Sequence, residues 1–280
     1  MKGINKGIAL LTIILVIFMY PSTYIFMNRH ISSIKSTFKI LTAKESKQKE
    51  LSTKANTTSK RDTKIVFIFD SGYECVYEKA YPIFKKYNMK GNVGVIPSLT
   101  TEKEYMDVTK LTTLYLEGWD IINQSFPYEY DWYDNSTRVL EDIQKTKKWM
   151  DNKFFTRSSD SVIMTYGEVN PYLIKLLKEK GYKSLRTSDN IIDLSKYQIE
   201  YTPIKSMDLT KNPDINTIEK FIADAHKAKA TIVFILNKID ETNGHEEKVF
   251  NQSTLLKLLE YIYLNKNELE VIPYSYLFTE

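Results

Sequence analysis

The feature that most restricts the fold of this chain is an alternation, from residue 65 onward, of short apolar runs with longer amphipathic stretches. Residues 65–69 (IVFIF) suit a strand that is buried on both faces, and residues 77–87 follow with helical spacing. The same reasoning predicts further strands at residues 91–96, 119–123, 161–165, 230–236 and near 271. It predicts further helices at residues 111–117, 136–153, 171–180, 215–227 and 255–265. Repeated strand–helix units imply an α/β fold with a parallel sheet, either open or closed into a barrel.

Residues 8–27 form an uncharged, mostly apolar run, with Lys2 and Lys6 before it and Arg29 after it. About twenty residues at a rise of about 1.5 Å cross the hydrocarbon core of a bilayer, so the run predicts a transmembrane helix. A cleavable signal peptide is the alternative, but residues 21–25 (PSTYI) make a poor cleavage site. We therefore expect residues 1–27 to be an uncleaved signal-anchor. The basic residues on both sides of the run do not set its orientation.

Residues 28–64 are rich in Lys, Ser and Thr, so they cannot bury enough surface to offset the entropy of ordering them. We expect a flexible basic stalk, with residues 65–280 as the folded domain. The stalk is either a solvated spacer or a contact for anionic polymer and lipid headgroups. Residues 29–64 carry ten Lys or Arg against three Asp or Glu, whereas residues 65–280 carry 27 against 32. The folded part is mildly acidic, which argues against nucleic-acid binding.

Four stretches of the expected sheet carry motifs in order and at suitable separations. They are residues 67–73 (FIFDSGY) with the helix that follows, residues 116–125 (LEGWDIINQS), residues 164–167 (MTYG) with residues 172–182, and residues 231–239 (TIVFILNKI). Together they resemble the polysaccharide deacetylase (NodB-homology) family, whose motifs read T-F-D-D-G-Y, G-x-E-I-x-N-H-S/T-x-x-H, P-Y-G and a strand ending in His. The resemblance covers essentially residues 65–280. It implies a distorted (β/α) barrel with its site at the C-terminal strand ends. In this chain we expect one N-terminal transmembrane helix, that of residues 8–27, to precede the barrel.

The resemblance also implies a role for each position of the motifs. Family members bind a divalent metal, commonly zinc, through one Asp and two His, and a second carboxylate and a further His act as general base and acid. By position, Asp70 matches the general base. Ser71 stands at the metal-binding Asp, and Gln124 and Tyr128 stand at the two His. Asn237 stands at the general-acid His.

The three metal positions and the acid position are therefore replaced together by neutral residues. We expect no metal cofactor; zinc or another divalent metal belongs to the chain only if it is an active enzyme. The basic residue that orients the base in the family has no counterpart in residues 161–164 (SVIM). A rebuilt site would need His245 as a ligand or acid, or Glu74, Glu129 and Asp131 beside Asp70. His226 we expect to be an ordinary satisfied side chain, and the single Cys75 excludes a disulfide framework.

Residues 126–134 (FPYEYDWYD) place five aromatic and three acidic residues just after the third expected strand. In this fold the loop would rim the cleft, so its rings would either stack on sugars or pack the loop onto the barrel. We take Tyr128, Tyr130 and Trp132 as substrate-binding candidates, together with Tyr166 in the segment similar to P-Y-G.

Three hypotheses for function follow. The first is a catalytically degenerate family member, held by a single pass in the cell membrane with its domain outside, that binds a cell-surface polysaccharide or assists a glycan-processing protein. The second is an active hydrolase that removes N- or O-acetyl groups through a non-standard site. The third is a membrane interaction scaffold, because a fold alone does not settle function.

Overall fold

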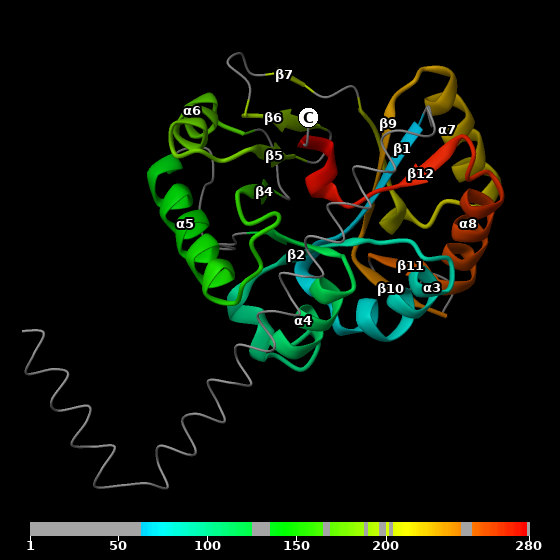
Figure 1. Cartoon of the computed structure of the whole chain (residues 1–280), viewed down its shortest axis with the longest axis horizontal. Coiled ribbons are helices and arrows are strands. Elements are labelled where there is room, and N and C mark those ends of the chain that lie inside the picture. Colours follow the sequence, from blue (N-terminus) through cyan, green and yellow to red (C-terminus); the bar gives the residue numbers. More distant parts are fainter. Residues whose placement is uncertain are drawn as a thin grey trace, which may run out of the picture. The chain divides into compact units, whose positions relative to one another are not determined.

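A computed structural model describes residues 63–124, 135–164, 169–187, 190–195, 200–201, 204–241 and 248–278. Its main feature is a ten-stranded sheet in the order β7-β6-β5-β4-β3-β2-β1-β9-β8, with β12 also paired to β1 (Figure 1). The strands are β1 (Thr63–Phe69), β2 (Asn92–Val95), β3 (Asp120–Asn123), β4 (Ser161–Ile163), β5 (Ser184–Arg186), β6 (Ile191–Asp193), β7 (Glu200–Tyr201), β8 (Ile204–Asp208), β9 (Thr231–Leu236) and β12 (Leu269–Val271). All neighbouring pairs are parallel except β5–β6 and β6–β7, which are antiparallel. A separate parallel pair joins β10 (Lys238–Asp240) to β11 (Val249–Asn251).

The helices connect the parallel strands and lie outside the sheet (Figure 1). They are the π-helix η2 (Val76–Ala80), α3 (Tyr81–Lys86), α4 (Val108–Leu116), α5 (Ser136–Asn152), α6 (Pro171–Glu179), α7 (Ile215–Lys227) and α8 (Gln252–Leu264). The helices and strands expected from periodicity are confirmed, most closely at α7. Gly118 and Gly181 adopt positive φ angles of 97° and 80° just beyond α4 and α6, where a left-handed residue ends a helix.

The two edges of the sheet lie close together. Strand β7 ends at Tyr201 and β8 begins at Ile204, so three Cα–Cα steps, at most about 11 Å, separate the edges. The sheet must curl to satisfy this short connection. The result is the nearly closed barrel that the family resemblance implies.

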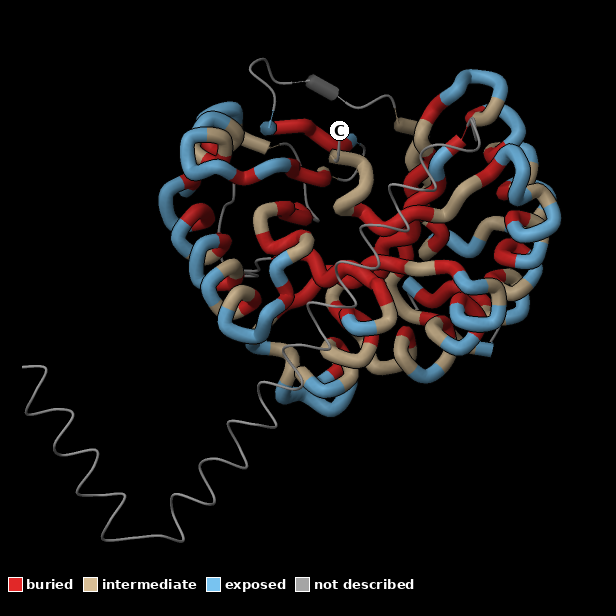
Figure 2. Tube along the Cα trace, in the orientation of Figure 1, coloured by how far each residue is buried: buried red, intermediate tan, exposed pale blue. Residues whose placement is uncertain are grey.

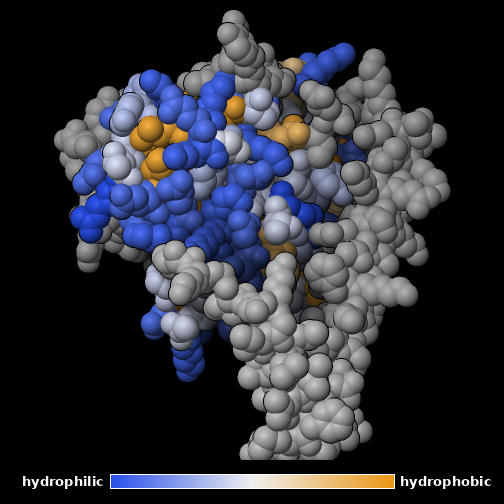
Figure 3. All heavy atoms as spheres, turned by 60° about the vertical axis from the view of Figure 1, so that its left-hand side comes forward, coloured by the Kyte–Doolittle hydropathy of each residue, from blue (hydrophilic) through white to orange (hydrophobic). Residues whose placement is uncertain are grey.

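Alternation along the strands divides the apolar side chains between the interior of the barrel and two clusters under the helices. In β1, Ile65, Phe67 and Phe69 belong to the core under the helices, whereas Val66 and Ile68 belong to the interior of the barrel. Figure 2 shows β2 to β6 buried and β1 and β9 almost entirely so, whereas β8 is intermediate and exposed residues gather on the outer sides of the helices. The described surface in Figure 3 is mostly hydrophilic, with small hydrophobic patches.

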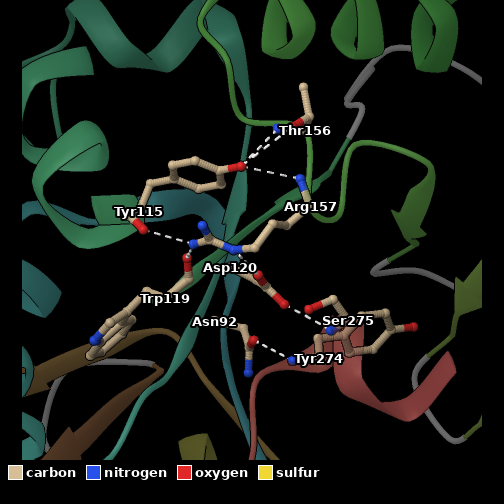
Figure 4. A network of polar contacts seen from close by, with 8 residues as sticks. All are labelled: Asn92, Tyr115, Trp119, Asp120, Thr156, Arg157, Tyr274 and Ser275. Carbon is tan, nitrogen blue, oxygen red and sulfur yellow. Dashed lines mark hydrogen bonds and ion pairs between the residues drawn. The ribbon is translucent and has the colours of Figure 1, made fainter. Parts of the chain in front are cut away.

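The amino-terminal end of the barrel is closed by the C-terminal 3₁₀ segment Tyr274–Phe278 (Figures 1 and 4). The backbone N–H of Tyr274 donates to Asn92 Oδ1 at 2.7 Å, and that of Ser275 donates to Asp120 Oδ2 at 2.7 Å. Arg157 Nε holds the other oxygen of Asp120 at 3.0 Å. Asn92 and Asp120 begin β2 and β3, so this network lies opposite to the strand ends that carry the motifs.

No helix in the described ranges is long and apolar enough to cross a membrane. The expected anchor and residues 28–62 of the expected stalk lie outside the described residues. Thr63 and Lys64, expected at the end of the stalk, belong instead to β1, so the folded domain begins two residues earlier than residue 65.

Candidate active site at the carboxyl ends of the strands

Polar residues continue the inward-facing rows of the barrel at its carboxyl end. Val66 and Ile68 of β1 face the interior, and Asp70 follows them at the same spacing. The same alternation directs Gln124 after β3, Arg186 in β5 and Asp208 in β8 toward this interior. Parallel strands end at one edge of a sheet, so these side chains converge there.

Asp70 and Arg186 form a buried ion pair. Nη2 of Arg186 donates to Asp70 Oδ1, and each residue is 2% exposed. Burial raises the pKa of Asp70, and the charge and hydrogen bond of Arg186 act against that rise. Asp208 also acts to raise this pKa, and Lys248 to lower it. The carboxylate at the general-base position therefore has a fixed basic partner.

The sequence motifs did not predict Arg186 as the partner of Asp70. The family resemblance places the basic residue within residues 161–164, on β4, whereas the structure supplies Arg186 from the neighbouring strand, where Ile163 pairs with it in register. Strand β5 is only three residues long, too short to show a periodic pattern. Leu185 is its only apolar residue, so no apolar run marked Arg186.

Ser71 and Gln124 contact each other directly. The backbone N–H of Ser71 donates to Gln124 Oε1 at 2.6 Å, and Gln124 is fully buried. Ser71 has a left-handed backbone with φ of 68°, a strained conformation for a residue other than Gly or Asn. A Cβ added to Gly94 of β2 would lie 2.2 Å from Gln124 Oε1, so only glycine leaves room for this amide.

The described residues do not fit the metal that the family resemblance implies. No group of three or more His, Cys, Asp or Glu in the described ranges is placed to hold an ion. The Gln124 carbonyl oxygen accepts a peptide N–H, and the Asp70 carboxylate is paired with Arg186. Glu74 forms an ion pair with Lys110 instead of approaching Asp70.

The remaining candidates divide into described and undescribed positions. Asn237 is half-buried and follows β9, whose Leu236 pairs with Phe69, so it emerges beside Asp70. His226 lies at the other end of the barrel, where its Nδ1 is 2.9 Å from Thr63 Oγ1. The following candidates lie outside the described residues: Tyr128, Glu129, Tyr130, Asp131, Trp132, Tyr166 and His245.

Comparison with known proteins agrees with this fold. Residues 57–185 match the family model described as polysaccharide deacetylase. The chain is 24% identical over 129 residues to a poly-beta-1,6-N-acetyl-D-glucosamine N-deacetylase of Staphylococcus aureus, which covers 41% of this chain and 44% of the relative. The match thus spans less than half of that curated relative.

Two solved structures share the fold. The Bc1960 peptidoglycan N-acetylglucosamine deacetylase superposes with a TM-score of 0.54 and 14% identity, covering 79% of this chain and 90% of the other. A family 4 acetyl xylan esterase from Clostridium thermocellum, in complex with a cobalt ion, gives a TM-score of 0.52 and 12% identity, covering 77% and 90%. The resemblance to the polysaccharide deacetylase family is therefore confirmed as a family-model match over residues 57–185, a little under half of the chain.

Proposed function

We propose that this chain is a catalytically degenerate polysaccharide deacetylase-family protein that binds a cell-surface polysaccharide, or assists its processing, without hydrolysing it. One observation carries the proposal: Ser71 and Gln124, at two positions of the family's metal ligands, are hydrogen-bonded to each other. A neutral amide oxygen that already accepts a peptide N–H offers a divalent ion no charge. Asn237, at the acid position, has no proton to give near neutral pH.

The polysaccharide that we propose contains N-acetylglucosamine. The S. aureus relative is named for poly-N-acetylglucosamine, and the Bc1960 structure is named for peptidoglycan N-acetylglucosamine. A barrel that keeps the family fold but not its metal ligands could retain recognition of such a polymer after losing hydrolysis.

We also propose that residues 1–27 anchor the chain in the cell membrane by a single pass and that residues 28–64 form a stalk. The uncharged run of residues 8–27 supports the anchor. A polymer of the cell surface as ligand supports placing the domain outside. A glycan-processing protein in the same membrane is the partner that an accessory role requires.

An active hydrolase is the second candidate. Asp70 keeps the position of the general base, and the relatives named above are deacetylases. The pairing of Asp70 with Arg186 supplies the basic residue that orients the base in the family. In an active enzyme the ion would need ligands from beyond the described residues.

Metal content and acetate release separate the two. The full chain, purified in detergent, is incubated with zinc or cobalt, desalted, and analysed for metal and for acetate released from poly-N-acetylglucosamine and peptidoglycan fragments. We expect no retained metal, no acetate and saturable binding of the polymer by calorimetry. The control variant Ser71→Asp/Gln124→His/Tyr128→His restores the family's ligand types, so we expect it to retain about one equivalent of metal.

Stoichiometric metal together with acetate release from the unmodified chain would instead establish the hydrolase. A chain that neither binds nor hydrolyses the polymer would leave the scaffold hypothesis, which co-purification of a membrane partner would then support.

A further inference from the structure

Two loops and the start of β10 bring a pair of aromatic rings and a lysine to the same end of the barrel as Asp70. Phe69 of β1 pairs with Leu236 of β9, so the segments that contain Tyr73 and Lys238 leave the sheet side by side. Tyr105 comes from the connection between β2 and α4, on the other side of β1. We call Tyr73, Tyr105 and Lys238 the aromatic platform.

The two rings of the platform are stacked. Their centroids are 4.8 Å apart with an interplanar angle of 23°, and Nζ of Lys238 lies 4.9 Å from the Tyr73 centroid. All three residues are partly exposed. Tyr73 packs against the core under the helices, whereas Tyr105 is not among the side chains that do so. The fold therefore does not need the Tyr105 ring as core filling.

Backbone contacts fix the rings in place. The N–H of Met106 donates to Gly72 O at 2.8 Å, and the N–H of Glu74 donates to Glu104 O at 2.8 Å. On the other side, the N–H of Ile239 donates to the Cys75 thiol at 3.4 Å. The segments on both sides of Tyr73 are thus tied together before any ligand binds. A preorganised surface loses less conformational entropy on binding than a mobile one.

The hydroxyl group of Tyr105 stays protonated at physiological pH. Burial and a hydrogen bond with Tyr73 raise the pKa of Tyr105 to about 12. The platform therefore offers the ring and neutral hydroxyl of Tyr105 and the ammonium group of Lys238. This combination suits a sugar, which presents C–H groups on its ring faces and hydroxyl and acetamide oxygens at its edges.

We propose that the aromatic platform binds an N-acetylglucosamine unit of the polymer, with the sugar against the Tyr105 ring and the Lys238 ammonium donating to its oxygens. This site rests on the proposed function and adds to it, because it lies on loops different from residues 126–134 and 166. The polymer would then contact the barrel on the β1, β2 and β9 side of Asp70.

Calorimetric titration of the full chain in detergent with a β-1,6-linked N-acetylglucosamine pentamer tests the platform. We expect Tyr105→Ala to weaken binding by about tenfold and Tyr105→Phe, which keeps the ring, by less than about threefold. Lys238→Gln is expected to weaken binding by about threefold or more. Tyr105→Leu, which keeps apolar bulk without a ring, should behave as Tyr105→Ala, and its thermal unfolding should match that of the unmodified chain.

The matched control is Tyr263→Ala in the last turn of α8. Tyr263 is 42% exposed and has Lys266 Nζ 4.7 Å from its ring centroid, but α8 ends at the amino-terminal end of the barrel. Its replacement should leave pentamer binding unchanged. If Tyr105→Ala and Tyr105→Leu are folded and bind the pentamer as tightly as the unmodified chain does, the proposed sugar site on the aromatic platform is wrong and the proposed function stands. If the unmodified chain binds no pentamer, both fail.

Discussion

Arg186 and Asp70 are each almost completely removed from water, so each depends on the other for compensation of its charge. Replacing such a pair by apolar residues is often tolerated, whereas removing one partner leaves an uncompensated buried charge. Nε of Arg186 is also buried and has no hydrogen-bond partner among the described residues. The pair is therefore costly to maintain, which is characteristic of a site and not of ordinary core packing.

The variant Arg186→Met should lose stability in a pH-dependent way. Without the guanidinium, burial holds the pKa of Asp70 still further above its ordinary value of 3.8. A raised pKa in the folded chain means that folding favours the protonated carboxyl. The stability that this protonation contributes is fully present below the ordinary pKa of 3.8 and is lost as the pH rises through the pKa of the folded chain. We expect a loss of about 3 kcal/mol relative to the unmodified chain at about pH 7, and a smaller loss at about pH 4. Urea denaturation followed by Trp fluorescence at both pH values measures the difference.

The double variant Asp70→Asn/Arg186→Met is the control. It carries neither charge, so we expect it to recover part of the lost stability and to show none of the added pH dependence. An equal loss for Arg186→Met at both pH values would mean that the guanidinium contributes packing alone.

Sequence motifs located some residues of this site and could not locate others. Asp70, Ser71 and Gln124 were located because the stretches that contain them resemble the motifs of the polysaccharide deacetylase family. Their mutual contacts depend on Gly94 and on the left-handed backbone of Ser71, which no local pattern encodes. The motifs did not reveal Arg186, because Arg186 comes to lie beside Asp70 only through the spatial order of the strands.

Among the elements, long periodic stretches were predictable and short ones were not. Helix α7 and strand β9 carry clear apolar patterns over 13 and six residues. Strands β5, β6 and β7 have only two or three residues each, and they define the antiparallel edge that makes the barrel nearly close. Their pairing is imposed by neighbouring strands, so propensity alone does not reveal it.

The C-terminal segment acts as a closing element of the barrel. Tyr274 is fully buried in the interior core, and its hydroxyl lies 3.1 Å from Ser184 Oγ at the start of β5. This segment therefore links the parallel part of the sheet to the antiparallel edge. It also covers the inward-facing apolar residues at the end remote from Asp70.

A chain that ends at Pro273 should consequently be much less stable than one that ends at Phe278. The shorter chain loses the Tyr274 ring from the core and leaves Asn92 Oδ1 and Asp120 Oδ2 without their backbone donors. We expect a loss of about 4 kcal/mol or more, with increased binding of a hydrophobic dye. Thermal unfolding of both chains measures this loss. Equal melting temperatures would show that the segment only lies over a barrel that is stable without it.

For the whole molecule, the proposed function joins three parts with different physical properties. The apolar run would hold the chain in the bilayer, the basic stalk would span the space beside it, and the mildly acidic barrel would meet the polymer. An accessory protein of this kind gains from being tethered, because confinement near a surface raises the effective concentration of a weak binding site.

Fractionation and protease treatment of intact cells test this arrangement. We expect the full chain in the membrane fraction, and trypsin added outside should cut within residues 29–64, where ten Lys or Arg lie, releasing a fragment that contains the barrel. Ile13→Arg/Ile17→Arg places two charges in the apolar run, each costing about 2.5 kcal/mol or more at a helix centre, and should abolish membrane retention. A control variant, Ile13→Leu/Ile17→Leu, should be retained. A chain that trypsin cannot reach in intact cells would place the barrel inside, where a surface polysaccharide could not be its ligand.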